Sequence, residues 1–200
     1  DVLYHVVPSG TGKKAILDLN QKEFEKMLIG GASWCRDNGY ATDNDVECIE
    51  DYGKIPGADP SQVSDKALKR GIGQVGSLGS GNHYLEIQRV NPDDIKDEEL
   101  ARKLGFDREN QIAVMIHCGS RGFGHQIATD NLVSFSKAMQ KYGLHTGDRE
   151  LACAPFDSPE GKNYYAAMAC AANYAFVNRQ IITHRVREAM ANIFGKSQRE

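Results

Sequence analysis

The sequence has no run of about 18 consecutive apolar residues, so it contains no readable transmembrane helix. Its first residues do not have the form of a signal peptide. Because the chain begins at Asp1 rather than at methionine, we expect a processed or excised segment. Its 200 residues suit one domain, or one large piece of a domain, with enough chain to bury a core.

Pairs of cysteines at Cys-x-x-Cys spacing are also missing. The five cysteines are an odd number and are widely separated: Cys35, Cys48, Cys118, Cys153 and Cys170. This pattern argues against a disulfide framework and against a zinc ribbon, and it favours a reducing compartment. We therefore expect a cytoplasmic protein that is not associated with a membrane.

A strong excess of either charge is missing as well, because 24 basic residues stand against 27 acidic ones, a net charge of −3. This balance does not indicate a nucleic-acid binder. The basic residues do gather in residues 179–199. This stretch contains one acidic residue, Glu188, and five basic residues: Arg179, Arg185, Arg187, Lys196 and Arg199. Such a run can meet phosphates, but a solvated helix face is the more common explanation and the one that charge alone favours.

Hydrophobic periodicity predicts an α+β fold with a mixed sheet and packed helices. The last helix, from Ser158–Pro159 towards Gly195, is long and rich in alanine, which allows close packing. The other expected helices cover residues 20–38, 60–70, 92–104 and about 124–142. The expected strands cover residues 4–7, 83–90 and 112–116. The last of these is an almost continuous apolar run, which is typical of a strand buried on both faces.

One stretch, GSGNHYLEIQ at residues 79–88, places an amide, an imidazole and a carboxylate where a glycine loop meets a strand. Taken singly, Asn82, His83 and Glu86 are best explained as a turn residue, a structural histidine and a surface carboxylate. Together, beside a loop whose amides can reach an anion, they favour a binding site. Strict alternation places Asn82 and Glu86 on one face of the strand and His83 on the other.

His117 and Arg121 form a second group, at the end of the strand 112–116. The end of a strand before a glycine-rich loop and a helix is a usual place for ligand groups. Two histidines from neighbouring strands, His83 and His117, could share one Zn, Mn, Fe or Co ion. Adjacent residues of an extended chain point apart, so Cys118 need not join His117. Arg121 offers a planar fork to phosphate, although an arginine that only covers the turn is about equally compatible with the sequence.

The other histidines have weaker claims to chemistry. His184 lies within a helix between apolar residues, where a packing role is expected. The remaining three, His5, His125 and His145, belong to no polar cluster of this kind.

Three segments resemble the RtcB family of RNA ligases: GSLGSGNHYLEIQ, IHCGSRGFGHQIATD and EGKNYYAAMACAANYAFVNRQIITHRVRE. The resemblance extends over nearly all of residues 4–190. It implies an RtcB-like fold and a ligase, dependent on GTP and Mn²⁺, that joins an RNA 3′-phosphate or 2′,3′-cyclic phosphate to a 5′-hydroxyl in tRNA splicing or RNA repair. In that family GMP is first attached to a histidine and then passed to the RNA 3′-phosphate.

The same resemblance implies roles for individual residues. His83 matches a histidine that binds one of two manganese ions, and His117 matches a histidine that binds the other. Asn82 and Glu86 match residues that contact the nucleotide, so Asn82, His83 and Glu86 together are expected to form the GTP side of the pocket. Arg121 matches an arginine that grips the RNA phosphate.

Other motifs of the family are not found in this sequence. An Asp-x-x-Cys segment is expected upstream, and a further metal histidine, the guanylylated histidine and a lysine at the guanine are expected downstream. The resemblance therefore implies that residues 1–200 are the central segment of a single RtcB-like catalytic domain, inactive alone and without the GMP-accepting residue. Two alternatives remain open: a non-catalytic piece that binds metal or RNA, and a metal-dependent phosphoesterase. The expected partners are GTP and RNA, as tRNA halves or broken ends.

Overall fold

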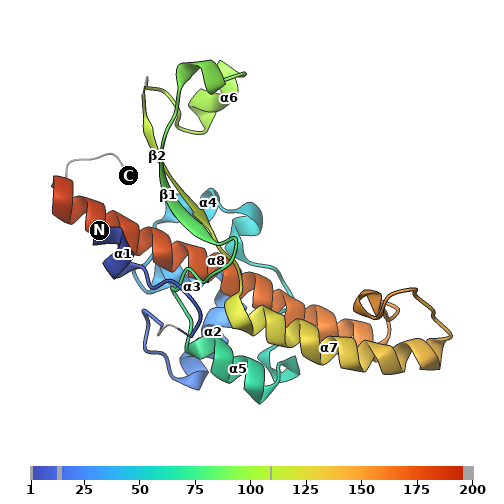
Figure 1. The fold of residues 1–200 in the computed structure, drawn as a ribbon. Helices are drawn as coiled ribbons and strands as arrows, with labels where there is room; N and C mark the ends of the chain where they lie inside the picture. Colours follow the sequence, from blue (N-terminus) through green and yellow to red (C-terminus); the bar gives the residue numbers. More distant parts are fainter. Residues whose placement is uncertain (1, 13–14, 109, 196–200) are drawn as a thin grey trace.

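A helix of 36 residues, α8 (Pro159–Phe194), runs through the whole molecule and carries much of its core (Figure 1). The structure is a computed structural model and describes residues 2–12, 15–108 and 110–195. Ser158 accepts a hydrogen bond from the Gly161 amide, Pro159 occupies the first turn, and the helix ends at Gly195. The long C-terminal helix and the α+β class expected from the sequence are therefore confirmed.

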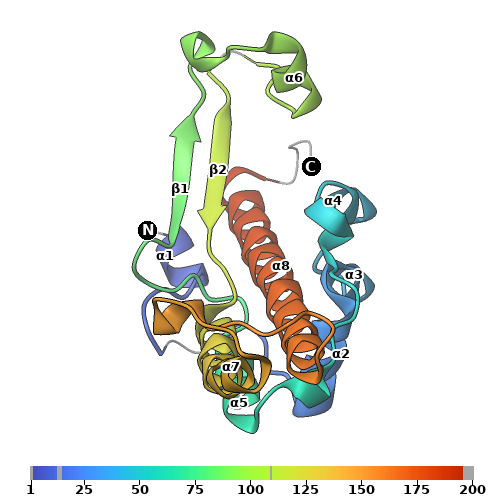
Figure 2. The ribbon, with the colours of Figure 1, turned by 90° about the vertical axis from the view of Figure 1, so that its right-hand side faces the viewer.

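The main core lies between α8 and three shorter helices, α2 (Gln21–Gly30), α5 (Asp65–Ile72) and α7 (Arg121–Tyr142). Its centre is a group of fully buried aromatic rings, Phe24, Phe123 and Tyr174, whose centroids lie 5.2 to 5.9 Å apart. Figure 2 looks along α8 and shows α7 and α5 below it, with α2, α3 and α4 on one side. The body of the molecule is thus a helical assembly built on α8.

The helix expected over residues 20–38 is present but broken in two. Asn20 and Glu23 form the capping box that begins α2. The chain then breaks at Gly31, where φ is +58°, and resumes as α3 (Ala32–Asp37). A side chain at Gly31 would overlap the carbonyl oxygen of Gly53, so the close approach of residue 53 requires a glycine here.

Short elements complete the connections between these helices. Thr42 caps the N-terminus of helix α4 (Asp43–Glu47), and Asp97 caps the N-terminus of α6 (Glu98–Lys103). The two helices expected at 60–70 and 92–104 each consist of a 3-10 turn followed by an α-helix. The 3-10 turns in the described residues are Glu50–Gly53, Pro60–Gln62, Pro92–Asp94 and Arg149–Leu151.

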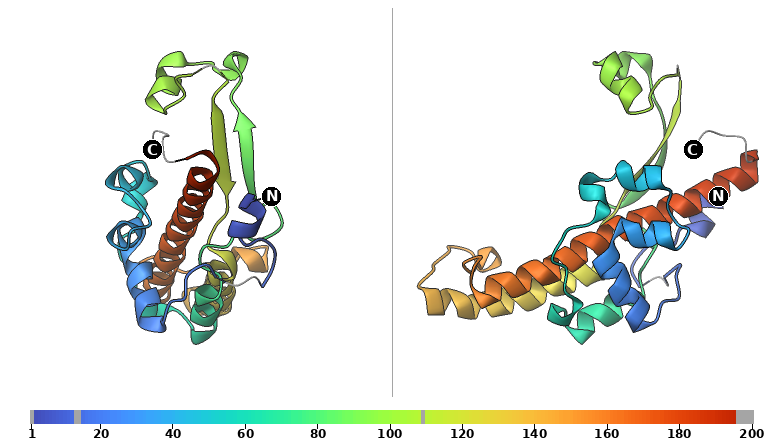
Figure 3. Two further views of the ribbon diagram at one scale, coloured as in Figure 1. Left: turned by 90° about the vertical axis from the view of Figure 1, so that its left-hand side faces the viewer. Right: turned by 180° about the vertical axis from the view of Figure 1, so that it is seen from behind.

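The two strands, β1 (Tyr84–Arg89) and β2 (Ile112–His117), form an antiparallel pair. They project from the helical body as an arm that carries α6 near its tip (Figures 1 and 3). The sheet of the described residues is therefore antiparallel, not mixed as expected, because no parallel strand flanks this pair.

The expectation that residues 112–116 are buried on both faces is wrong. Ile112 is 58% exposed and Val114 38%, and the facing Ile87 is 56% exposed. The apolar composition of residues 112–116 is typical of a buried strand. In an arm of two strands, however, only the base of the arm contacts the helical body. There Leu85 and Ile116 pack on a second cluster with Ile182 and Val186 of α8.

The prediction of a strand at residues 4–7 is also wrong, because Val2–Val6 form a helix, α1. Leu3, Val6 and Val7 recur at helical spacing and pack against the end of α8 in the second cluster. Tertiary packing overrides the strand preference of this short segment. In the part of the chain that the structure describes, no helix is long and apolar enough to cross a membrane.

The basic run of residues 179–199 mostly faces protein partners. Arg179 donates to the carbonyl of Cys118, Arg185 pairs with Glu188, and Arg187 binds the carboxylate of Asp45 through two hydrogen bonds of 2.8 Å. Lys196 and Arg199 lie outside the described residues. Within the described residues the run stabilises the fold through these contacts, so it is neither a free phosphate-binding surface nor simply a solvated helix face.

Replacing Asp45 by asparagine is expected to cost about 2 kcal/mol of unfolding free energy at neutral pH. The hydrogen bond from Arg187, ahead of the other contacts, lowers the pKa of Asp45 to about 2. Because this pKa lies below the ordinary value of 3.8, the stabilisation is complete above about pH 4 and is lost as the pH falls from about 4 towards 2. Urea unfolding between pH 7 and pH 2 measures this effect.

Asp43→Asn is the matched control, because Asp43 lies in the first turn of the same helix with its side chain 82% exposed. Its replacement should change the stability by less than about 0.5 kcal/mol. Equal acid sensitivity of both variants would show that the Asp45–Arg187 pair does not account for the acid dependence.

Candidate active site

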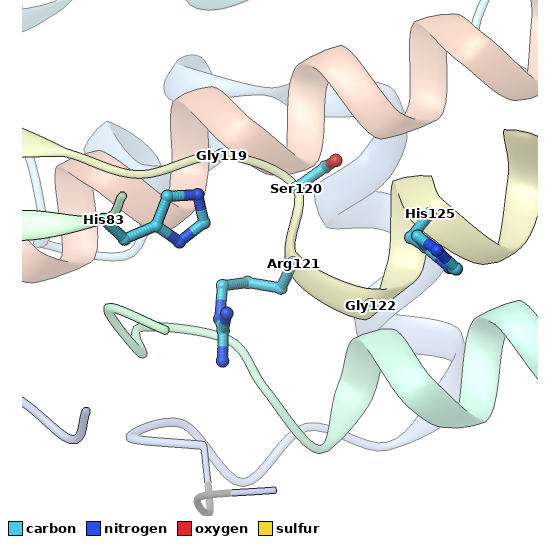
Figure 4. A pocket seen from close by; sticks show the side chains of 6 residues that line it. All are labelled: His83, Gly119, Ser120, Arg121, Gly122 and His125. Carbon is cyan, nitrogen blue, oxygen red and sulfur yellow. The ribbon is translucent and has the colours of Figure 1, made fainter. Parts of the chain in front are cut away.

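Three of the predicted site residues, His83, His117 and Arg121, gather where the arm joins the helical body. Four segments meet there: the glycine loop 76–81, the start of β1, the end of β2 and the first turn of α7. An open pocket of about 460 Å³ lies at the first turn of α7, between the residue before β1 and the residues that follow β2 (Figure 4). Six residues line it: His83, Gly119, Ser120, Arg121, Gly122 and His125.

His83 and His117 are neighbours, with 6.0 Å between their ring centroids. Nδ1 of His83 lies 2.9 Å from the carbonyl oxygen of Leu78. Since a carbonyl only accepts, this contact assigns the proton of the neutral ring to Nδ1 and leaves the lone pair of Nε2 free. A backbone carbonyl that orients an imidazole in this way is a common support for a metal-binding histidine.

The expected alternation of β1 is present. Tyr84 pairs with His117 across the two strands, and their rings stack at 5.2 Å with an angle of 13°. Glu86 lies on the same face opposite Met115, while Leu85 and Ile116 face the core. His83 precedes the first residue of β1, so it does not follow the alternation of side chains along the strand. Its ring can therefore lie close to that of His117.

Asn82 and Glu86 do not join this cluster. Both are exposed, and neither lines the pocket. The Glu86 carboxylate accepts a hydrogen bond of 2.8 Å from Gln88. Their contact with GTP stays a prediction, and so does the metal role of the two histidines.

Arg121 begins α7 in the left-handed region, with φ of +55°, which is uncommon for a residue other than glycine. Its Nε donates to Ser77 Oγ at 3.1 Å, and its Nη2 donates to the carbonyl oxygen of Gly10 at 3.2 Å. No carboxylate of the described residues forms an ion pair with it. These two bonds use two of its five N–H donors, so Arg121 both covers the loop and keeps donors for an anion.

Position 79 of the loop requires a glycine. Its φ is +104°, and a Cβ placed there would overlap Nη1 of Arg121 and stand 2.5 Å from Nδ1 of His83. The bare backbone of Gly79 thus allows both side chains to approach. Any side chain at this position would move one of the two groups that define the site.

The start of α7 favours negative charge. Its first turn contains no acidic residue, and Ser120 makes no side-chain capping bond. The Gly122 amide donates to Oε1 of Gln74 at 2.9 Å, which attaches the helix to the segment just before the glycine loop. The positive end of the helix dipole therefore adds to the charge of Arg121 at the pocket.

Asn178 is a fully buried residue of α8 that holds the site together, and no pattern in the sequence indicates this role. Its side-chain oxygen accepts from the Gly76 amide at 2.8 Å, and its nitrogen donates to the carbonyls of Ser77 and Gly119. It thereby joins the glycine loop to the end of β2. Its only signal in the sequence is an amide within an alanine-rich apolar helix.

Cys118 points away from the pocket, as expected from its position next to His117. The thiol is buried in the second core cluster, and Asn178 lies 3.4 Å from its sulfur. Burial raises its pKa above the usual range and outweighs the opposite effect of Arg179. In this structure Cys118 is therefore a buried thiol of the core that does not line the pocket.

The donor set fits a metal ion in part. The two imidazoles are close enough for one ion or for two neighbouring ions, since paired metal ions lie about 3.5–4 Å apart. Among residues 2–12, 15–108 and 110–195, however, no group of three histidine, cysteine or carboxylate side chains can hold a metal. A cationic pocket beside two imidazoles suits a protein that acts on phosphate groups.

Comparison with known proteins specifies this class. The model of the RtcB family, described as tRNA-splicing ligase RtcB, matches residues 1–200. The chain therefore belongs to the RtcB family.

Its curated relatives include three archaeal proteins, each named tRNA-splicing ligase RtcB. The protein of Archaeoglobus fulgidus is 48% identical over 198 residues, which are 99% of this chain and 40% of the relative. That of Pyrobaculum aerophilum is 50% identical over 98% of this chain and 40% of the relative. That of Methanocaldococcus jannaschii is 50% identical over 96% of this chain and 20% of the relative. The chain thus spans two fifths or less of the length of these relatives.

Proposed function

We propose that this chain supplies part of the active site of an RNA ligase that joins a 3′-phosphate or 2′,3′-cyclic phosphate end to a 5′-hydroxyl end. The main support is the meeting of His83, His117 and Arg121 at the start of α7, beside a pocket with no acidic lining residue. Membership of a family described as tRNA-splicing ligases gives the substrate class. The proposed partners are therefore RNA ends, such as tRNA halves, in the cytoplasm.

In this proposal His83 and His117 hold Mn²⁺ through their free ring nitrogens. When bound, the ion would neutralise phosphate charge as a Lewis acid. Two imidazoles form an incomplete manganese site, because this hard ion favours oxygen donors as well. We therefore propose that residues 1–200 form the central part of one catalytic domain and that its other ligands come from outside them.

GTP is the second proposed cofactor, with Asn82 and Glu86 at its binding surface beside His83. When bound, GTP would supply GMP to a histidine outside residues 1–200, with pyrophosphate as the leaving group, and from there to the RNA 3′-phosphate. Arg121 binds the RNA phosphate with the N–H groups that its bonds to Ser77 and Gly10 leave free. The first turn of α7 adds its dipole at the same place.

Arg121→Ala is expected to lower RNA ligation by about 100-fold or more, while formation of the GMP adduct changes by less than about threefold. The reason is that Arg121 contacts the phosphate of the RNA and not the nucleotide. The assay uses protein made from the complete reading frame that contains this chain, with a 3′-phosphate RNA, a 5′-hydroxyl RNA, GTP and Mn²⁺. Ligated RNA and labelled GMP on the denatured protein are measured separately.

Arg121→Lys is the conservative control, because it keeps the charge and loses the planar fork. We expect it to recover only a small part of the ligation. Equal loss of ligation and of adduct formation in Arg121→Ala would assign Arg121 to the support of the glycine loop alone. Release of phosphate from the RNA end without ligation would favour a phosphoesterase.

A further inference from the structure

A second arginine, Arg70 near the end of α5, lies against the same turn of α7. A Cβ placed on Gly122 would stand 3.1 Å from Nε and 3.2 Å from Nη2 of Arg70. The side chain is exposed, and no carboxylate of the described residues forms an ion pair with it. Gly122 lines the pocket between Arg121 and His125. The first turn of α7 is thus approached by two guanidinium groups without a carboxylate partner.

Arg70 is held in this place by a network of side chains that runs from buried Gln126 through half-buried Asp130 to exposed Ser64. Its Nη1 donates to Oε1 of Gln126 at 2.9 Å, and only 4% of Gln126 is exposed. The amide nitrogen of Gln126 donates to Asp130 at 2.7 Å, and the hydroxyl of Ser64 donates to the same carboxylate at 2.6 Å. A surface arginine seldom has such support. The network fixes the guanidinium before any ligand arrives, which lowers the entropy cost of binding.

Gly122 is the residue that lets this arrangement form. Its amide donates to Gln74, and its missing side chain leaves the space that Arg70 occupies. Arg121 precedes it directly and donates to Ser77 and Gly10. The two guanidinium groups therefore have separate anchors near one helix turn, and each keeps N–H donors that no described residue uses.

We propose that Arg70 binds a second phosphate of the RNA strand, the phosphodiester next to the terminal phosphate held at Arg121. This inference rests on the proposed function, because it takes the pocket as the site of the RNA end. A strand that crosses the first turn of α7 meets Arg121 at its end and Arg70 at the neighbouring phosphodiester. Such contacts fix the position of a strand and do not depend on its base sequence.

The test compares two ligands with protein made from the complete reading frame that contains this chain: a short single-stranded RNA with a 3′-phosphate, and a nucleoside 3′-phosphate that has no phosphodiester. Arg70→Gln is expected to weaken RNA binding by about tenfold and to leave nucleotide binding within about twofold. The slope of log affinity against log salt for the RNA should fall by about one unit. Fluorescence anisotropy and calorimetry measure the two affinities.

Lys69→Gln is the matched control, because Lys69 is exposed in the same last turn of α5, whereas it is Arg70 that bonds to Gln126 and approaches Gly122 of α7. It removes the same charge and should change RNA binding by less than about twofold. If Arg70→Gln does not fold by circular dichroism, Arg70→Lys replaces it and should show a smaller loss with the same preference for the RNA.

Each result separates this inference from the proposed function. Equal effects of the Arg70 and Lys69 variants, or equal losses for RNA and nucleotide, overturn the second phosphate contact and leave the proposed function standing. If the unmodified complete protein binds the nucleoside 3′-phosphate but gains nothing from the additional RNA, the second contact is also overturned. Failure of the unmodified complete protein to bind either ligand contradicts both proposals.

Discussion

Asn178→Ala is expected to lower the free energy of unfolding by about 3 kcal/mol, because it leaves several buried backbone groups without partners. The Gly76 amide and the carbonyls of Ser77 and Gly119 all lose a hydrogen bond. These groups belong to the two segments that carry the site. The imidazole signals of His83 and His117 should therefore shift in the NMR spectrum, and urea unfolding measures the change in stability.

Asn173→Ala is the control for this variant. Asn173 is equally buried on the same helix, but its side chain bonds to Leu28 and Ile55, away from the pocket. We expect a comparable loss of stability without a change at the two histidines. If both variants shift the histidine signals equally, Asn178 supports the fold in general and does not position the site.

Much of the helical framework could be predicted from local chemistry. The Asn20–Glu23 capping box, the Ser158–Pro159 start and the Gly143 terminator each act within one or two helical turns. The sequence alone therefore contains the information that places these ends. The break at Gly31 could not be predicted, because it depends on the approach of Gly53 from a separate segment.

The strands show the limit of hydrophobic patterns. The run at residues 112–116 has the composition of a fully buried strand, but burial depends on what covers it. In the structure only the base of the arm has a partner, so Ile112 and Val114 are exposed. At residues 4–7 the packing of Leu3 and Val6 on α8 decides in favour of a helix.

The site was predictable where polar residues stand at strand ends. His83, His117 and Arg121 were selected for that reason, and the structure brings them together. Asn82 and Glu86 were selected from the same stretch, but both lie outside the pocket. His125 lines the pocket, although the sequence does not indicate a site there. The position of a histidine within a helix does not show which segments that side of the helix contacts. Arg70 and Asn178 act through contacts distant in sequence, which no local pattern contains.

The largest effect on ligand binding is expected from the two histidines. His117→Ala should lower the affinity for Mn²⁺ by about tenfold or more, equivalent to roughly 1.4 kcal/mol or more, because one of two ligands is lost. His83→Ala should have the same effect for the same reason. His184→Ala is the control, because His184 lies beside Tyr40 and Glu188.

The most direct test of the central claim is a titration with Mn²⁺ of protein made from the complete reading frame that contains this chain, followed through the NMR signals of the six histidines of residues 1–200. Mn²⁺ is paramagnetic and broadens signals close to its binding site. The account predicts that the ring signals of His83 and His117 broaden first and together, well before those of His5, His145 and His184, and that either alanine variant abolishes this preference. Uniform broadening, or earlier broadening beside the acidic residues 43–51, would contradict a metal site at these two histidines.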